Sequence, residues 1–247
     1  MMSGHSKWST IKHKKAAKDE KRGKLFAKLA RGIEVAVRDG GGDPEMNAPL
    51  ALAVQKAKDA SMPNENIERA IKRGAGDTEG ADYQEIWYEG YAPGGVALYV
   101  QVLTDNRNRA ASDVRTAFTR HGGSLGEPGS VAYLFEQKGY IIATGDEDEV
   151  MLAALDAGAE DIRPSGERFE IISAAADFGA VRDALAVVGI EMDTAEVTQL
   201  ASTAITVEED AARQVLRLLD ALEDLDDVQS VFGNFDMSDD VLAAVAG

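Results

Sequence analysis

Lysine and arginine side chains crowd the start of this chain, and the chemistry that such a cluster performs is phosphate binding. The first 31 residues hold ten Lys or Arg and two acids, a local net charge of +8, whereas the 247-residue chain has a formal net charge of −17. Mutual repulsion makes such a cluster costly unless a polyanion neutralises it, and each neutralised phosphate releases condensed counterions. The composition therefore predicts a nucleic-acid partner.

The residues themselves point to two segments as candidate contacts. In the first, Trp8 offers a ring that can stack on a base, and His5 and His13 add hydrogen-bond donors between the lysines. The second is a polar loop at residues 104–109. The nucleic-acid-binding residues predicted from these segments are His5, Lys7, Trp8, Lys12, His13, Lys14, Lys15, Lys18, Lys21, Arg22, Lys24, Arg107 and Arg109.

The polar loop at residues 104–109 has two interpretations. Arg107 and Arg109 stand at the expected start of a helix, where anions are favoured, and are isolated cations in an otherwise acidic region. Alternatively, Asn106 or Asn108 caps this helix and the arginines pair with nearby acids. The sequence leaves both open.

Catalytic and metal-binding patterns find little support. The chain has no cysteine, which excludes disulfides and thiolate zinc sites, and its three histidines, His5, His13 and His121, have no metal-ligand spacing. It has no phosphate-binding Gly-x-x-x-x-Gly-Lys-Ser/Thr loop. We therefore expect a protein that is not an enzyme, with no cofactor, no metal and no small-molecule substrate.

The charge changes sign along the chain. Residues 1–74 carry a net charge of +7, residues 75–137 carry −5, and residues 138–247 carry −19. An acidic body repels phosphate, so nucleic acid is expected at the basic end only, although the acids also serve solubility. No apolar run is long enough to span a membrane, and no apolar stretch follows the basic start as in a secretory signal. These features and the lack of cysteine predict a cytoplasmic protein without a membrane partner.

Three helices are expected to position the basic residues. Apolar residues recur every four positions from Arg22 to Arg38, and glycines 40–42 end this helix. A second helix opens at Pro49, and a third begins near Pro63 with Asn64 as its cap and ends before Gly74. The preceding residues 5–21 have too few apolar side chains for a core helix and suit an exposed segment that orders on binding.

Beyond residue 82 the apolar period changes to that of strands. The pattern predicts strands at 96–103 and 130–136 around a helix at 110–121, then a strand at 204–207, a helix at 208–222 and a strand at 228–235. Joined across the gap, these pieces give the βαββαβ order of a ferredoxin-like domain.

The residues between these two halves repeat the same order. Strands are expected at 140–144, 161–163, 169–173 and 196–200, with helices at 146–157 and 178–188. The predicted fold class is therefore α+β, an N-terminal three-helix domain followed by two ferredoxin-like α/β domains, one inserted in the other. The expected boundaries are 1–76, 80–137 plus 202–240, and 138–201; a single α+β body with one sheet is the alternative.

Long motifs across the chain resemble one known family. They include GHSKWSTIKHKKAAKDEKRGKLFAKL at the start, MPNENIERAIKRGAG, YEGYAPGGVALYVQVLTDNRNRAASDVR, FTRHGGSLGEPGSVAYLFE and the late LEDLDDVQSVFGNFD. Together they are similar to the YebC/PmpR family, which includes the mitochondrial translational activator of cytochrome c oxidase. The resemblance spans residues 4–236.

The resemblance implies three domains, with one α/β domain inserted in the other. It implies either a DNA-binding transcriptional regulator or a translation factor that acts on ribosomes stalled at proline-rich stretches. By position it points to residues 5–22, the turn at 69–74 and the loop at 105–109 as contacts, and to no catalytic residue. The turn adds Arg69, Lys72 and Arg73 to the predicted nucleic-acid-binding residues. The sequence also lacks a clear recognition helix, which favours RNA over the DNA major groove. A protein-interaction scaffold with an acidic binding surface is a third possibility.

Overall fold

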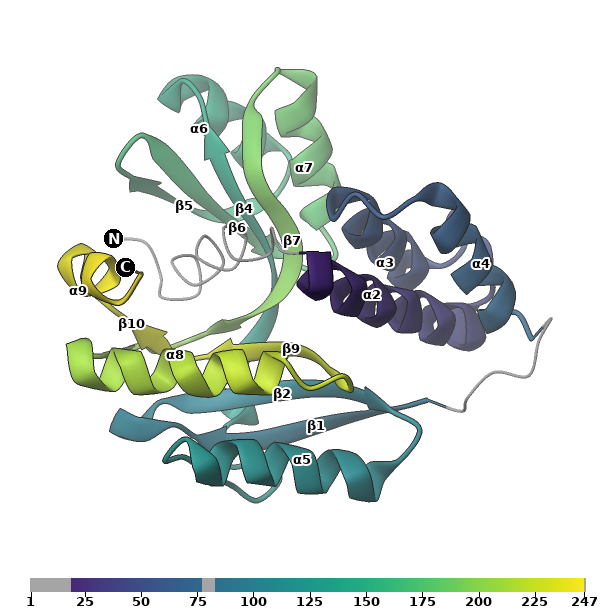
Figure 1. The fold of residues 1–247 in the computed structure, drawn as a ribbon. Coiled ribbons are helices and arrows are strands. Elements are labelled where there is room, and N and C mark those ends of the chain that lie inside the picture. Colours follow the sequence, from purple (N-terminus) through teal and green to yellow (C-terminus); the bar gives the residue numbers. More distant parts are fainter. Residues whose placement is uncertain (1–18, 77–82, 247) are drawn as a thin grey trace.

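A computed structural model of the chain describes residues 19–76 and 83–246. Its first part is a bundle of three helices, α2 (Asp19–Gly40), α3 (Ala48–Asp59) and α4 (Asn64–Gly74), as expected from the apolar spacing. The bundle has its own core, which includes Ile33, Val37, Leu50 and Ile67. Figure 1 shows it beside the rest of the molecule.

The turn between α2 and α3 is fixed by one buried side chain. Asn47 accepts a hydrogen bond from the Leu50 backbone N–H and so caps α3. Its amide donates to the carbonyls of Ala36 and Gly41, 2.7 and 2.8 Å away, so the same residue also closes the end of α2. Pro63 stands at the cap position of α4, one residue before the predicted cap Asn64.

The second part contains an antiparallel sheet with the order β3-β1-β2-β9. Its strands are β1 (Gln84–Tyr91), β2 (Ala97–Thr104), β3 (Ser124–Leu125) and β9 (Val228–Gly233). Helices α5 (Arg107–Arg120) and α8 (Glu209–Glu223) share one hydrophobic core with the apolar face of this sheet. A short 3₁₀ turn at Pro93–Gly95 joins β1 to β2.

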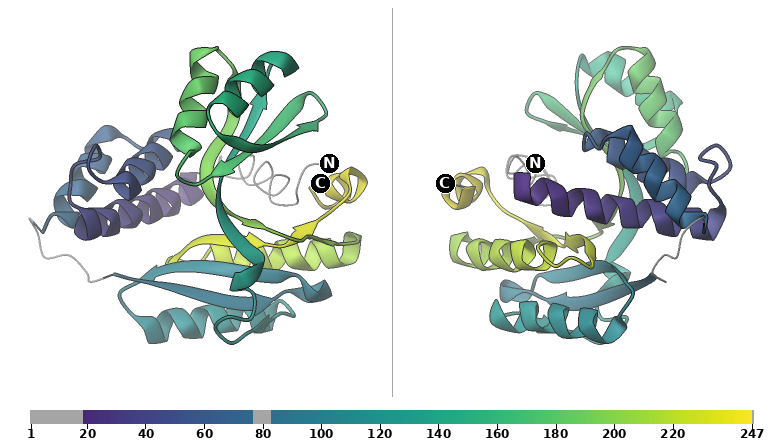
Figure 2. Two further views of the ribbon diagram at one scale, coloured as in Figure 1. Left: turned by 180° about the vertical axis from the view of Figure 1, so that it is seen from behind. Right: turned by 45° about the vertical axis from the view of Figure 1, so that its right-hand side comes forward.

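A second antiparallel sheet has the order β5-β6-β4-β7. Its strands are β4 (Phe135–Thr144), β5 (Ala159–Ser165), β6 (Arg168–Ala174) and β7 (Glu191–Ala201). Helices α6 (Glu147–Asp156) and α7 (Phe178–Val187) pack on it. This is the ferredoxin-like order predicted for residues 138–201. The long strands β4 and β7 pair along their length and run between the two layers of the molecule (Figure 2).

Short elements complete the chain. A 3₁₀ turn at Ala132–Leu134 precedes β4, and β8 (Ile205–Thr206) pairs in parallel with β10 (Phe235–Asp236). Helix α9 (Asp239–Ala246) packs on α8. A row of stacked rings ties the first sheet to the start of β4, because Tyr99 lies 4.2 Å from Trp87 and 5.6 Å from Phe135 between ring centroids.

The α+β fold class is confirmed, but two strands of the first sheet were predicted wrongly. Residues 130–136 form mostly a turn, and residues 204–207 contribute only to the small parallel pair. Their places in the sheet are taken by β3 and by β1, and neither of these strands was predicted from the sequence. The order of the sheet nevertheless matches that of a ferredoxin-like sheet. β3 occupies the position of the second strand of the βαββαβ order, and β1 occupies the position of the third strand, although β1 precedes β2 in sequence.

The alternative of a single sheet is wrong, since the described residues form two separate four-stranded sheets. The helical bundle, the first sheet and the second sheet each have a main hydrophobic core of their own, and the second sheet carries a further small cluster at Tyr140, Ile142 and Ile172. We propose on this basis the same three domains, 1–76, 80–137 plus 202–240, and 138–201. Within the described ranges, no helix has both the length and the apolar character that a membrane span needs.

Candidate nucleic-acid interface

The described part of the chain contains only some of the predicted contact residues. His5, Lys7, Trp8, Lys12, His13, Lys14, Lys15 and Lys18 lie outside the described residues, and the side chain of Lys21 is not described either. For these residues nucleic-acid binding stays a prediction. The cations that follow them on α2 are described, and three of these side chains contact another part of the same protein.

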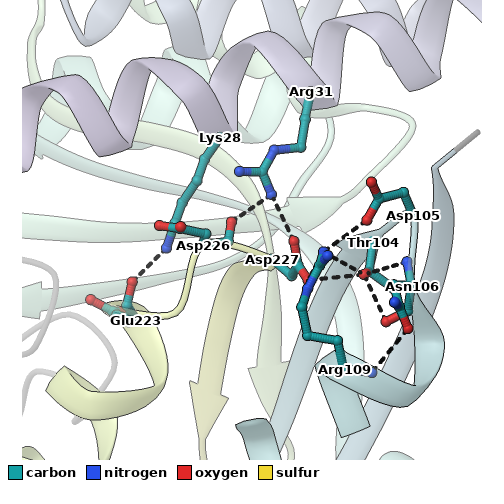
Figure 3. A network of polar contacts seen from close by, with 9 residues as sticks. All are labelled: Lys28, Arg31, Thr104, Asp105, Asn106, Arg109, Glu223, Asp226 and Asp227. Atoms are coloured by element: carbon teal, nitrogen blue, oxygen red, sulfur yellow. Dashed lines mark hydrogen bonds and ion pairs between the residues drawn. The ribbon is translucent and has the colours of Figure 1, made fainter. Parts of the chain in front are cut away.

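The basic stripe of α2 faces an acidic turn of the same molecule. Lys24, Lys28 and Arg31 are spaced four and three residues apart, so they share one helix face. All three donate to carbonyls of the turn between α8 and β9: Lys24 to Asp224 (3.4 Å), Lys28 to Glu223, and Arg31 to Asp226 (2.6 Å). Figure 3 shows Lys28 and Arg31 reaching down to this turn.

Asp227 is the centre of the polar network at this turn. Its carboxylate accepts hydrogen bonds from Arg31 (3.3 Å), from Arg109 (2.8 Å) and from the Thr104 hydroxyl (2.9 Å), as Figure 3 shows. The side chain is only 14 % exposed. One carboxylate therefore connects α2, the end of β2 and the start of α5.

At Arg109 the structure agrees with the second interpretation of the loop at 104–109, in which an asparagine caps the helix and the arginine pairs with nearby acids. Asn106 caps α5 by accepting from the Arg109 backbone N–H at 3.1 Å. Hydrogen bonds to Asp227 and to Asp105 raise the pKa of the Arg109 guanidinium further above its ordinary value. Arg107 is exposed and makes no ion pair with any described residue. Arg107 is thus the more available of the two arginines.

A pocket of about 570 Å³ lies beside this network, between α2, α5 and the acidic turn. Three cations line it, Lys24, Arg31 and Arg109. They are outnumbered by the carboxylates of Asp105, Asp113, Asp224, Asp226 and Asp227. An excess of negative charge repels phosphate, so this pocket is not where we expect a nucleic-acid backbone to bind.

The cations of α4 lie at the surface of the bundle. Arg69 pairs with Glu65 at 2.7 Å, and Arg73 pairs with Glu34 at 2.9 Å. Burial raises the pKa of the Glu34 carboxyl, and the nearby Arg73 opposes this effect. The side chains of Arg69 and Arg73 remain 59 % and 45 % exposed, and Lys72 is exposed. The Arg69–Glu65 pair is exposed on both sides and therefore weak, so Arg69 can exchange its carboxylate partner for phosphate. Glu34 is only 8 % exposed, and loss of Arg73 would leave its buried carboxylate without this partner, so Arg73 is the less available of the two.

Arg22 is exposed, and its guanidinium stands 5.4 Å from the centre of the Phe26 ring. Together with the α4 cations and Arg107, it belongs to the predicted contacts that the structure leaves at the surface. Asp227 and the docking role of Lys28 and Arg31 were not predicted from the sequence. Two signals were present, the helical spacing of the three cations and the acidic run at 223–227.

Comparisons with known proteins cover nearly the whole chain. Residues 6–77 match a family model described as the TACO1/YebC protein N-terminal domain, and residues 83–235 match one described as the TACO1/YebC second and third domain. A probable transcriptional regulatory protein of Beutenbergia cavernae is 62 % identical over 98 % of both chains. One with the same description from Rubrobacter xylanophilus is 58 % identical over the full length of both.

The fold also has a solved counterpart. The crystal structure of a conserved hypothetical protein from Aquifex aeolicus is similar to this chain with a TM-score of 0.78 and 48 % sequence identity. The match covers 90 % of this chain and 93 % of that one.

Proposed function

We propose that this chain, which belongs to the TACO1/YebC family, is a regulator of gene expression that binds nucleic acid through its basic N-terminal residues and catalyses no reaction. The observation that carries the proposal is the charge of the first 31 residues, +8 in a chain of net −17. The name of the close relatives supports a role in transcription. A cytoplasmic location follows from the same proposal, since DNA and ribosomes are both present there.

The cations of the basic cluster have two roles, contact with the rest of the protein and contact with phosphate. Lys28 and Arg31 are used to dock the helical bundle on the acidic turn at 223–227. The phosphate contacts are therefore assigned to the cations that precede them in sequence, from Lys7 to Arg22, together with the exposed cations Arg69, Lys72 and Arg107. The acidic body repels a polyanion, which restricts binding to the basic end.

A second candidate polymer is ribosomal RNA, and α4 favours it. Helices α3 and α4 are joined by a short turn, as in a helix-turn-helix, which would make α4 the helix that reads bases. The first residues of a recognition helix contact base edges, but here Glu65 and Glu68 stand in that position, and the Glu65 side chain is 83 % exposed. These carboxylates oppose insertion into a DNA groove, whereas a basic segment that folds on structured RNA needs no such helix.

Charge reversal of the N-terminal lysines tests the proposal. Binding of fluorescent duplex DNA and of a structured RNA of equal length is measured by anisotropy for the wild-type chain and for K12E/K14E/K15E/K18E. If about six phosphates are contacted, wild-type affinity falls roughly a thousandfold between 50 and 200 mM salt, and the variant shows a much shallower salt slope. Unchanged affinity of the variant for both polymers would refute the assignment.

A matched control separates the site from the net charge. The variant K58E/R115E/R120E/R217E changes the net charge equally, but its four exposed residues lie on α3, α5 and α8. It is expected to retain the wild-type salt slope. Co-sedimentation with ribosomes at the same salt then separates the polymers: sequence-blind DNA binding without ribosome association excludes the RNA candidate.

A further inference from the structure

Large exposed apolar side chains lie on the two helices that cover the second sheet, α6 and α7. Among the described residues, eight large hydrophobic side chains are exposed, and five of them lie on α6 or at the end of α7. On α6, Leu152 is 66 % exposed, Leu155 50 % and Met151 40 %. At the end of α7, Val187 is 86 % exposed and Val188 49 %. Single exposed apolar residues are ordinary, but a group of them on packed neighbouring helices marks a contact surface.

The exposed residues of α6 form one continuous strip. Val150 and Ala154 point inward and are completely buried in the core beneath the helix. Met151 and Leu155 are four residues apart, and Leu152 and Leu155 are three apart, so these side chains are neighbours on the opposite side. The strip is therefore not the edge of the core that α6 already covers.

Carboxylates stand at both ends of this strip. Glu147 and Asp148 lie one turn before Met151 and Leu152, and Asp156 lies one turn after Leu152. The helix EDEVMLAALD carries no lysine or arginine. Acids in the first turn stabilise any helix through its dipole, but Asp156 at the last turn gains nothing from that effect. An apolar centre between two acidic ends thus needs a second explanation.

We propose that the outer strip of α6 docks a cationic amphipathic helix of a partner protein. The partner would place apolar side chains on Met151, Leu152 and Leu155, and lysine or arginine beside the acids at either end. The ten residues of α6 span about 15 Å, which matches three turns of such a helix. Charge excludes other occupants, because a second copy of this strip would bring acid against acid, and nucleic acid would meet the same carboxylates.

The proposal is independent of the basic N-terminal residues, and a model peptide tests it on the full chain. The probe is a fluorescent 14-residue peptide of lysine and leucine with all leucines on one helix face, and its counterpart has glutamate in place of lysine. We expect the lysine peptide to bind at least tenfold more tightly than the glutamate peptide.

Substitutions then locate the binding. L152S/L155S keeps the charge of the protein unchanged and is expected to weaken the lysine peptide about tenfold or more, since two leucine contacts are lost. E147Q/D148N/D156N should weaken it and reduce its salt dependence. The control M46S removes an apolar side chain that is 84 % exposed in the α2–α3 turn and should bind as wild type.

All these positions are at the surface, so the variants are expected to fold, which circular dichroism checks; L152S alone serves if the double variant does not fold. Wild-type affinity in the serine variants would overturn the proposal, because binding would then reflect net charge alone. Equal affinity for the two peptides would also overturn it, as would concentration-dependent dimerisation that L152S/L155S abolishes.

Discussion

Glu89 on β1 offers the sharpest test of how this fold is held together. Its side chain is 7 % exposed, and its carboxylate accepts three backbone hydrogen bonds, from Gly129 (2.6 Å), Val131 (2.6 Å) and Ala132 (2.7 Å). These donors lie in the turn that leads from the first sheet into β4. Glu89 therefore fixes the point at which the chain leaves one sheet for the other.

Replacing Glu89 with Gln keeps the shape but removes the charge and one acceptor. Hydrogen bonds to a charged group contribute about 1.5–3 kcal/mol each, and neutral ones about 0.5–1.5 kcal/mol. The Gln side chain cannot accept at both of its ends, so one or two N–H groups lose their partner. After allowing for the easier burial of a neutral amide, we expect E89Q to lower the free energy of unfolding by about 2–4 kcal/mol at pH 7.

The effect should depend on pH with a definite sign. Burial alone would raise the pKa of Glu89, but the hydrogen bonds from Gly129, Val131 and Ala132 outweigh it and hold the pKa below its ordinary value of 4.5. A carboxyl with a lowered pKa in the folded state stabilises the fold above its unfolded pKa. That contribution is lost as the pH falls below about 4.5 and through the folded pKa.

Urea unfolding of wild type and E89Q at pH 7, 4 and 3 measures the difference. It should be largest at pH 7 and shrink at pH 3, with equal m-values. The control E85Q changes an exposed residue of the same strand and should stay within about 0.5 kcal/mol of wild type. A difference at pH 7 below about 0.5 kcal/mol, or one that does not change with pH, would refute the reasoning.

Three further outcomes are expected. N47A removes the buried cap of α3 and its two bonds to carbonyls, and should destabilise the chain by about 2–3 kcal/mol in thermal unfolding; an unchanged Tm would contradict this. R31A removes the contacts to the acidic turn and should speed amide hydrogen exchange in α2 while leaving the second sheet unaffected. G90A places a Cβ 2.7 Å from the Phe118 ring and should destabilise by about 1–3 kcal/mol, whereas G23A meets no neighbouring atom and should stabilise by about 0.5–1 kcal/mol; equal Tm changes would contradict the packing.

The helices and the second sheet were predictable because their apolar spacing is strong and local. The strand β1 was missed because its sequence, QEIWYEGY, places two glutamates and a glycine among the aromatic residues. Glu89 can be buried there only because three N–H groups forty residues later bond to it. Residues 130–134 are largely apolar and typical of a strand. With Val131 and Ala132 bonded to Glu89, this segment instead contains the 3₁₀ turn at Ala132–Leu134.

The basic cluster was visible in composition, but its internal partners were not. The acidic turn at 223–227 lies about 195 residues after Lys28 and Arg31 in sequence. It meets them because β9 pairs with β2 and so carries the end of α8 toward α2. Both of these strands were predicted, and the ferredoxin-like order places them side by side. That order does not say where the helical bundle packs, so the contact between α2 and the acidic turn was not predicted.

The docking of α2 limits how a polyanion can use the cluster. For a phosphate to reach Arg31, it must displace the Asp226 carbonyl and the Asp227 carboxylate from a side chain that is only 15 % exposed. The exposed Arg22 forms no ion pair with an acid among the described residues, so no such exchange is needed there. Salt screens an ion pair between the exposed Arg22 and a phosphate more strongly than it screens the partly buried pair between Arg31 and Asp227. The availability of the cations for phosphate thus decreases along the chain. We expect the salt dependence of nucleic-acid binding to be set by the cations before residue 24, while Lys28 and Arg31 remain bonded to the acidic turn.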